Sequence, residues 1–334
     1  MAAMLGPCTK FIGRGAILKG RHAIICAMTT SFTVDTRRPA DFLAFAVMVL
    51  LCATWGIQSV ATKWLIPQVS PLMQGAIRSL VACVCVVAYA QVRGICLITR
   101  ETAWAGLAAG VLFGSEFVFV YAGLTYTSVS HSVVFVYLAP VLTALGLALF
   151  LPSERLRTLA WIGIALAFGG VAVAFSEKLG VPSVAGDRMW FGDLLSVISA
   201  FLWAATTIVI RATSLSNAPA AQTLFYQLAV SAVILPVASV AVGEPGIIHI
   251  DAAALGILAF QGIIVAFLSY LAWFWLLTQY SASRMSVFGF LTPLFGVIGG
   301  ATFLSEPISA TFLSAALLVL LGIVLVNWPA RSGS

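Results

Sequence analysis

The chain carries one apolar motif twice, as LTYTSVSHSVVFVYLAP at Leu124–Pro140 and as LTQYSASRMSVFGFLTP at Leu277–Pro293. Each copy is followed by an acidic turn, Pro152-Ser153-Glu154 after the first and Leu304-Ser305-Glu306 after the second. Chance similarity between apolar segments is the alternative, but the shared serines and proline argue for an internal repeat. The residues that match without a gap are Leu124/Leu277, Thr125/Thr278, Ser128/Ser281, Ser130/Ser283, Val134/Val287, Phe135/Phe288, Leu138/Leu291 and Pro140/Pro293.

The composition is that of a chain surrounded by lipid. Of its 334 residues, 61% are hydrophobic and only 8% are charged, and the mean hydropathy is +1.08. A soluble domain has about 25% charged residues, so these charges could not cover a surface that faces water. The net charge of +6 is spread between apolar runs, which argues against a nucleic-acid partner. The six cysteines show no zinc-site spacing, and we expect neither a metal nor a cofactor.

Apolar stretches close to bilayer length follow one another from Asp41 onward. A transmembrane helix needs about 20 residues, and the short connections predict that consecutive helices are antiparallel neighbours. The predicted helices cover residues 42–64, 71–91, 102–122, 129–151, 157–175, 191–211, 220–242, 252–277, 284–304 and 309–328.

Five helices in each half is an odd number, so the second half must enter the membrane in the opposite direction. The first helices of the halves also correspond, because Trp55 precedes Lys63 by the same distance as Trp203 precedes Arg211. The predicted fold class is therefore an all-α integral membrane protein with ten transmembrane helices in two inverted five-helix repeats. Inverted repeats around a site near the membrane centre are a transporter architecture.

This pattern also divides the chain into segments. We expect a disordered cytosolic segment first, or alternatively a natural start at Met28, and a short cytosolic tail at the end. The predicted first segment, first repeat, linker, second repeat and tail are residues 1–40, 41–175, 176–190, 191–328 and 329–334.

Lysine and arginine gather on one side of the predicted helices, which fixes the orientation by the positive-inside rule. The other side keeps only Lys63, Lys178 and Arg188. Both termini are therefore predicted to be cytosolic. The arginines on the cytosolic side are Arg37, Arg38, Arg93, Arg100, Arg155, Arg157, Arg211, Arg284 and Arg331.

The segments Gly123–Leu156 and Leu276–Ile308 resemble the EamA-type family of the drug/metabolite transporter superfamily, and the resemblance covers about residues 41–328. It implies a ten-helix, two-repeat carrier whose relatives include bacterial exporters of amino acids and other metabolites. It also implies a place in the bacterial inner membrane. Relatives often have glycine before the acidic residue of each turn, whereas this chain has Ser153 and Ser305.

Two ionisable residues lie inside predicted helices, Arg78 in the second and Glu116 in the third. Such groups are costly in lipid unless they are paired or hydrated, and they often mark a transport site. Both lie at a similar depth, about 20 Å from the cytosolic helix ends at 1.5 Å per residue. We expect Glu116 to bind a proton or a substrate ammonium, with Arg78 as its partner or as an anion anchor. A buried pair that only fixes helix packing is the alternative.

Polar and aromatic residues in other helices are candidates to line the same cavity. In the second half, the positions that correspond to Arg78 and Glu116 lie near Tyr226 and Tyr270 and carry no charge. The cavity should therefore be electrically asymmetric. The candidates are Trp55, Gln58, Tyr121, Tyr137, Tyr226, Gln227, Gln261, Tyr270 and Trp273, of which Tyr121 and Trp273 could instead be interface anchors. Pro140 and Pro293 are predicted helix breaks or hinges, since proline removes a backbone donor; a packing kink is equally compatible.

Two further polar positions receive structural interpretations. His131, at the start of the fourth predicted helix, is expected to be a hydrated helix-end histidine, with a pH sensor as the alternative. Glu154 and Glu306 are expected to cap helices or to pair locally.

The sequence thus predicts a secondary carrier that exports small organic metabolites by alternating access. No Walker motif is present, so ATP is not the driver; a proton gradient acting through Glu116 is expected, with uniport or exchange still open. An intramembrane enzyme would need a catalytic or metal constellation at membrane depth, and a channel would need repeated polar rings. Neither pattern is found, so we expect neither an enzyme nor a channel. The expected partners are a small-molecule substrate and the bilayer.

Overall fold

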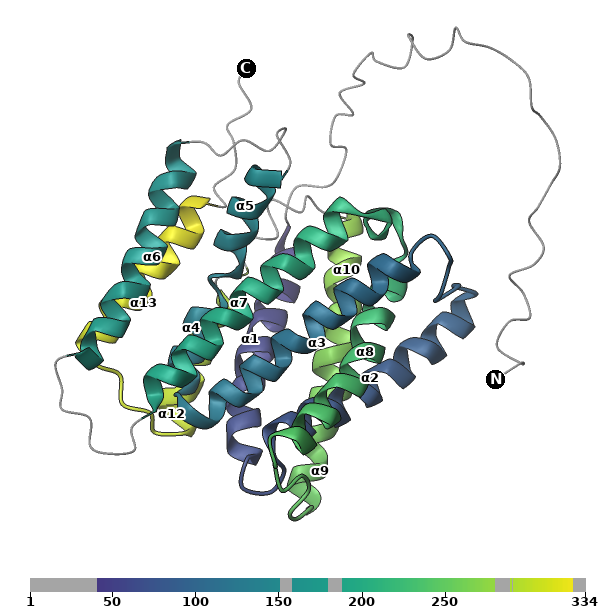
Figure 1. Cartoon of the computed structure of the whole chain (residues 1–334), viewed down its shortest axis with the longest axis horizontal. Coiled ribbons are helices and arrows are strands. Elements are labelled where there is room, and N and C mark those ends of the chain that lie inside the picture. The colour runs from purple at the N-terminus through teal and green to yellow at the C-terminus, as the bar shows by residue number, and fades with distance from the viewer. Residues whose placement is uncertain (1–40, 151–157, 180–187, 280–288, 290, 327–334) are drawn as a thin grey trace, which may run out of the picture.

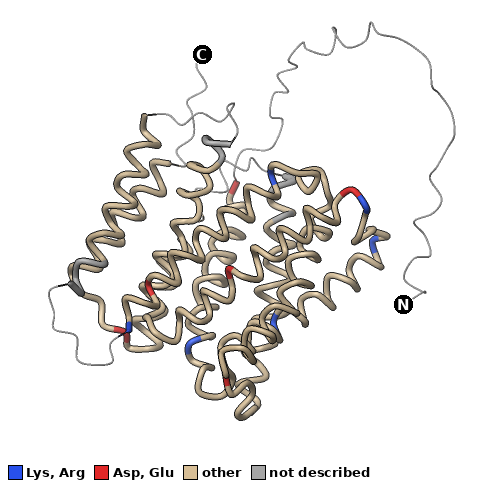
Figure 2. The backbone as a smooth tube through the Cα atoms, in the orientation of Figure 1, with Lys and Arg blue, Asp and Glu red and all other residues tan. Residues whose placement is uncertain are grey.

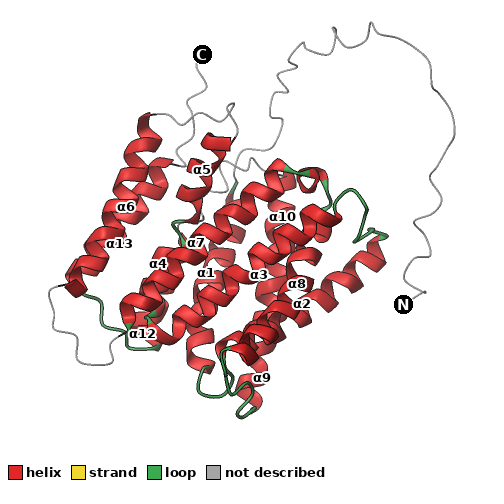
Figure 3. Ribbon diagram, in the orientation of Figure 1, coloured by secondary structure: helices red, strands yellow, loops and turns green. Residues whose placement is uncertain are grey.

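The structure is a computed structural model that describes residues 41–150, 158–179, 188–279, 289 and 291–326 (Figure 1). Over these residues the chain is a bundle of helices with no named strand (Figure 3). The predicted tails, the turn at Glu154 and most of the predicted linker lie outside the described residues, as does the first part of the predicted helix 284–304.

Each predicted apolar range contains a helix among the described residues. The first half of the chain forms α1 (Phe42–Leu65), α2 (Pro71–Arg93), α3 (Ala103–Tyr126), α4 (Val129–Val136), α5 (Ala139–Phe150) and α6 (Thr158–Leu179). The second half forms α7 (Met189–Ala212), η3 (Ser214–Asn217), α8 (Ala220–Ala241), α9 (Ala252–Ala259), the π-helix η4 (Phe260–Ser269), α10 (Tyr270–Gln279), α12 (Leu291–Phe303) and α13 (Ala310–Val326).

Length and composition make seven of the described helical segments candidate membrane spans, and three shorter apolar helices accompany them. The outer surface of the bundle is apolar: the side chains of Phe42, Val92 and Trp104 are more than 80% exposed. Figure 2 shows that the described charged residues lie mainly toward the helix ends. Such a surface is stable only in lipid, so the chain is a multi-pass membrane protein.

One of the predicted helices is interrupted within the described residues. The predicted helix 129–151 breaks between Val136, where α4 ends, and Ala139, where α5 begins. Pro140 explains this break, because a proline ring clashes with the carbonyl group four residues earlier, here that of Val136. Pro293 is inside the first turn of α12, and residue 290 lies outside the described residues.

The predicted helix 252–277 changes geometry instead of breaking. Its middle third, η4, is a π-helix, and it continues into α10 at Tyr270. No proline or glycine pair announces this change in the sequence. Short π-helical segments are rare and are frequent at functional sites.

Helices of the two halves pack against each other throughout the bundle. α6 packs along α13, α3 along α7 and α8, α2 along α8, and α1 along α12. The α6–α13 contact depends on small residues: an added Cβ at Gly163 would lie 2.7 Å from the carbonyl oxygen of Gly322. In lipid, such close approach of backbones is a main source of helix association.

Candidate functional site

Arg78 is a buried arginine inside α2. Its side chain is 1% exposed, and its Cζ lies 4.0 Å from the centre of the Phe117 ring and 5.9 Å from that of Tyr121. Aromatic faces attract a guanidinium group in this arrangement. Its Nε has no hydrogen-bond partner among the described residues. A buried donor without a hydrogen-bond partner costs about 1–3 kcal/mol, so the position of Nε is a cost to the fold.

Glu116 lies on α3, directly before Phe117, and is 4% exposed. Its Oε2 is enclosed and, like Arg78 Nε, has no hydrogen-bond partner in the described part of the chain. Glu116 and Arg78 act on each other electrostatically. The sequence predicts a direct ion pair between them. Among the described residues, however, no ion pair with an N–O distance of 4.0 Å or less joins Arg78 and Glu116.

Tyrosines complete this polar region. Tyr270, the first residue of α10, lies within electrostatic range of Arg78, Glu116 and Tyr121. The hydroxyl of Tyr121 is also buried without a hydrogen-bond partner among the described residues, so Tyr121 is not an interface anchor. We call Arg78, Glu116, Phe117, Tyr121 and Tyr270 the central site. Within it, Arg78 Nε, Glu116 Oε2 and the Tyr121 hydroxyl each lack a hydrogen-bond partner among the described residues.

The predicted aromatic candidates extend this region toward α1. Trp55 donates a hydrogen bond from Nε1 to Ser269 Oγ at 2.8 Å, and its ring lies 6.3 Å from Tyr270 and 6.2 Å from Trp273. Tyr137 packs edge-on against Trp203 at 5.5 Å and is in electrostatic range of Tyr270. Trp55, Tyr137 and Tyr270 are only half-buried, although they lie inside the bundle. The structure therefore brings together Arg78, Glu116, Trp55, Tyr137 and Tyr270.

Two other candidates form hydrogen bonds to neighbouring helices. The Tyr226 hydroxyl lies 3.3 Å from Thr102 Oγ1, at the start of α3. Gln261 is fully buried and donates to Thr62 Oγ1 at 3.1 Å and to Gln74 Oε1 at 3.3 Å. These bonds join η4 to α1 and α2, while Gln261 Oε1 has no hydrogen-bond partner among the described residues.

The remaining two candidates are not linked to the central site by a described contact. Gln58 is half-buried on α1, and Gln227 is 7% exposed on α8.

A second polar region surrounds the first turn of α4. Glu306, in the connection from α12 to α13, accepts hydrogen bonds from the backbone N–H groups of Val129 at 2.7 Å and Ser130 at 3.1 Å, and from Ser130 Oγ at 2.9 Å. Lys63 Nζ lies 3.9 Å from Glu306 Oε1 and also donates to the carbonyl oxygen of Thr127. A carboxylate at a helix N-terminus satisfies free N–H groups and opposes the helix dipole. The expected capping role of Glu306 is confirmed, but the capped helix is distant in sequence.

The backbone around Glu306 is adapted to this contact. Ser305 has a φ of +52°, and no other non-glycine residue in the described ranges has a positive φ. An added Cβ at Gly300 would collide with the Glu306 carboxylate and would lie 3.0 Å from Ser130 Oγ. The left-handed conformation of Ser305 favours glycine, which has no Cβ to clash.

His131 and Asp193 meet on the other side of the same turn. His131 Nδ1 lies 3.0 Å from Asp193 Oδ2, and Thr127 Oγ1 donates to Asp193 Oδ1. Asp193, on α7, is 1% exposed and His131 is 6% exposed. The prediction of a hydrated helix-end histidine is therefore wrong, because α7 and α13 cover the start of α4. We call Lys63, His131, Asp193 and Glu306 the α4-start cluster.

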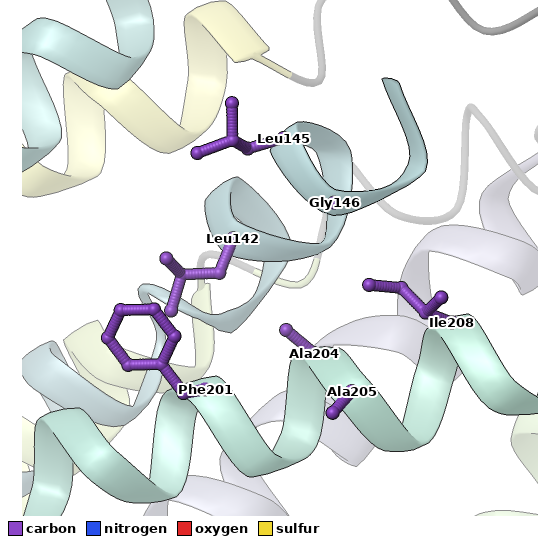
Figure 4. A pocket seen from close by; sticks show the side chains of 7 residues that line it. All are labelled: Leu142, Leu145, Gly146, Phe201, Ala204, Ala205 and Ile208. Carbon is purple, nitrogen blue, oxygen red and sulfur yellow. The ribbon is translucent and has the colours of Figure 1, made fainter. Parts of the chain in front are cut away.

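An apolar hollow of about 250 Å³ lies between α5 and α7 (Figure 4). It has almost no polar surface, so it offers nothing to orient a polar solute. The residues that line it are Leu142, Leu145, Gly146, Phe201, Ala204, Ala205 and Ile208.

Sequence reasoning missed several of these features. Asp193 is an acidic residue within an apolar helix, and this signal alone could have identified it. The approach of Phe117 to Arg78 and the distant capping by Glu306 depend on how the helices pack, and no local pattern carries them.

Fold and site together define a class of protein: a multi-pass membrane protein with ionisable and aromatic side chains enclosed among its described helices. Ionisable residues in that setting mark the pathways of solutes and ions. The chain matches the EamA-like transporter family twice, over residues 42–176 and 190–328, and it belongs to this family.

Individual relatives agree with this assignment. The chain is 28% identical over 300 residues to the "Uncharacterized transporter YvbV" of Bacillus subtilis, covering 88% of this chain and 93% of the relative. It is 25% identical over 293 residues to a "Probable amino-acid metabolite efflux pump" of Salmonella typhimurium, covering 86% and 94%. A solved crystal structure matches with a TM-score of 0.59 and 17% identity over 86% of this chain and 98% of the other, which supports the fold.

Proposed function

We propose that the chain is a secondary transporter that exports small organic metabolites, amino-acid-like or amphipathic, and that the central site binds them. The observation that carries the proposal is the burial of Arg78 and Glu116 with side-chain atoms that lack hydrogen-bond partners among the described residues. A substrate with a carboxylate and an ammonium group would satisfy both side chains at once. Charge-assisted hydrogen bonds of this kind are about twice as strong as neutral ones.

The aromatic residues support the amphipathic part of the substrate class. Trp55 and Tyr270 are half-buried with ring centroids 6.3 Å apart, and Tyr270 is within electrostatic range of Arg78 and Glu116. Such surfaces bind the apolar parts of organic solutes, while a few polar groups fix their orientation. The relative in Salmonella typhimurium is named as an amino-acid metabolite efflux pump, which is compatible with this class.

The transport mechanism in this proposal is alternating access between two inverted five-helix repeats, residues 41–175 and 191–328, which together make ten spans. The break before Pro140 would act as a hinge, and Pro293 would occupy the same place in the second repeat. A proton gradient would drive transport through Glu116. The protein would lie in the inner membrane with both termini in the cytosol, as the arginine distribution predicts.

Purified protein in liposomes tests this proposal. An imposed pH gradient and a mixed panel of amino acids and small amphipathic metabolites, read by mass spectrometry, should reveal gradient-dependent accumulation of at least one solute. Glu116→Gln should lose that accumulation, while Glu101→Gln, the same change at an exposed position, should retain it. Equal accumulation by wild type and Glu116→Gln would show that Glu116 has only a structural role. Accumulation of no solute by the wild type would contradict the carrier itself.

A further inference from the structure

Four ionisable side chains from four different segments surround the first turn of α4. Lys63 comes from α1, His131 from α4, Asp193 from α7 and Glu306 from the connection between α12 and α13. Lys63 and His131 belong to the first half of the chain, and Asp193 and Glu306 to the second. The α4-start cluster therefore joins the two halves at one end of the bundle.

The charges of this cluster do not balance when His131 is neutral. Two carboxylates then face one lysine, which leaves one net negative charge in a largely enclosed place. Arg188, the other cation at this end of α7, is exposed. A further positive charge on His131 would neutralise the cluster, and a net charge in a low-dielectric region is costly.

The surroundings of the His131 ring hold it toward Asp193. The ring stacks on Phe312 of α13 with 4.2 Å between centroids and 9° between planes, and Phe135 lies edge-on at 5.9 Å. With Nδ1 donating to Asp193 Oδ2, the Nε2 atom is the one that can accept a proton. Both Asp193 oxygens accept hydrogen bonds, from His131 and Thr127, so the carboxylate is ready to face an imidazolium.

We propose that His131 and Asp193 form a second proton-binding site of the transport cycle, separate from the central site. Proton uptake at Nε2 converts the hydrogen bond between α4 and α7 into an ion pair and strengthens the contact between these two helices. Proton loss leaves Asp193 without a charged partner in the pair and favours separation of α4 from α7. This proposal rests on the proposed transport function for its role in the cycle, but not for the binding of the proton itself.

Proton binding is measurable without transport. The chain has three histidines, and His22→Asn with His249→Asn leaves His131 as the only one. The ¹⁵N signals of its ring, recorded in nanodiscs between pH 5 and 8, should change from the neutral to the protonated pattern. A neutral ring over this whole range would overturn the proposal.

Transport then tests the role of the site. In liposomes, the ratio of accumulation with and without a pH gradient should fall at least about twofold in His131→Asn, because the histidine charge change is removed while Glu116 remains. His249→Asn, the same change at an exposed histidine, should keep the wild-type ratio. A wild-type ratio in His131→Asn would overturn the proposal. If the wild type moves no solute, the proposed function fails, and the ring signals still decide whether the proton site exists.

Discussion

The central site and the α4-start cluster contain similar charged side chains, but they differ in how many hydrogen-bond partners these side chains have. Arg78 and Glu116 are buried with Nε and Oε2 lacking hydrogen-bond partners in the described part of the chain. Glu306, by contrast, accepts three hydrogen bonds and faces Lys63, and Asp193 is bonded on both oxygens. Charges with a full set of hydrogen bonds hold helices together, whereas buried polar atoms without hydrogen bonds cost stability. In our proposals the same residue types therefore bind the solute in one region and join helices in the other.

Replacing Arg78 gives the largest expected effect and separates these two roles most clearly. Arg78→Met should lower transport about 10- to 100-fold, since a hydrogen bond to a charged group contributes about 1.5–3 kcal/mol. Its thermal stability in detergent should be equal to or higher than that of the wild type, because a buried donor without a hydrogen bond is removed. Uptake assays and thermal unfolding of the same preparation check both expectations. A clear loss of stability would mean that Arg78 holds the bundle together.

Glu306→Ala should show the reverse pattern. It removes the cap of α4 and the partner of Lys63, so the free energy of unfolding should fall by about 2 kcal/mol. Chemical unfolding in detergent measures this loss, with Glu101→Ala as the control at an exposed position. A stability equal to that of the control would mean that the contacts of Glu306 with α4 and Lys63 do not stabilise the fold.

Ser305→Gly should stabilise the same turn. The φ of +52° costs an L-residue about 1–2 kcal/mol, and glycine avoids most of this cost while losing some entropy. The expected gain is about 0.5–1 kcal/mol in the same unfolding experiment. Ser305→Ala, which keeps the steric restriction, should give no gain, and a gain of similar size in both variants would contradict the assigned strain.

The smallest effect concerns pH and Asp251, which precedes α9. Its carboxylate accepts a hydrogen bond from Ala254 N–H at 2.7 Å, and this bond is the main cause of its lowered pKa. A lowered pKa in the folded state contributes stability above the unfolded value of about 4, and this contribution is lost as the pH falls below it. When unfolding is measured between pH 3 and 7, the free energy of unfolding should therefore fall slightly less toward low pH in Asp251→Asn than in the wild type. Identical profiles would mean that this cap does not contribute.

The sequence predicts much of the fold because lipid imposes a simple rule on it. Apolar stretches of span length must become helices, and the position of Pro140 predicts the break between α4 and α5. The π-helix η4 has no such signal, because no residue type requires it locally.

The candidate site was predictable only in part, and the reason is physical. Arg78 and Glu116 stand out because a charge is rare in an apolar helix. Their partners do not stand out, since Phe117 and Tyr121 look like ordinary core residues. Tyr226 and Gln261 were selected for their residue type, but helix packing places them in other hydrogen bonds.

Discrimination between solute analogues tests the central claim most directly. For a solute that the protein transports, analogues that lack either the ammonium or the carboxylate group should compete at least about 10-fold more weakly in the wild type. Glu116→Gln should lose the discrimination against the analogue without ammonium, and Arg78→Met that against the analogue without carboxylate. If both variants discriminate as the wild type does, the charges of the central site do not bind the solute, and the account of this site is wrong.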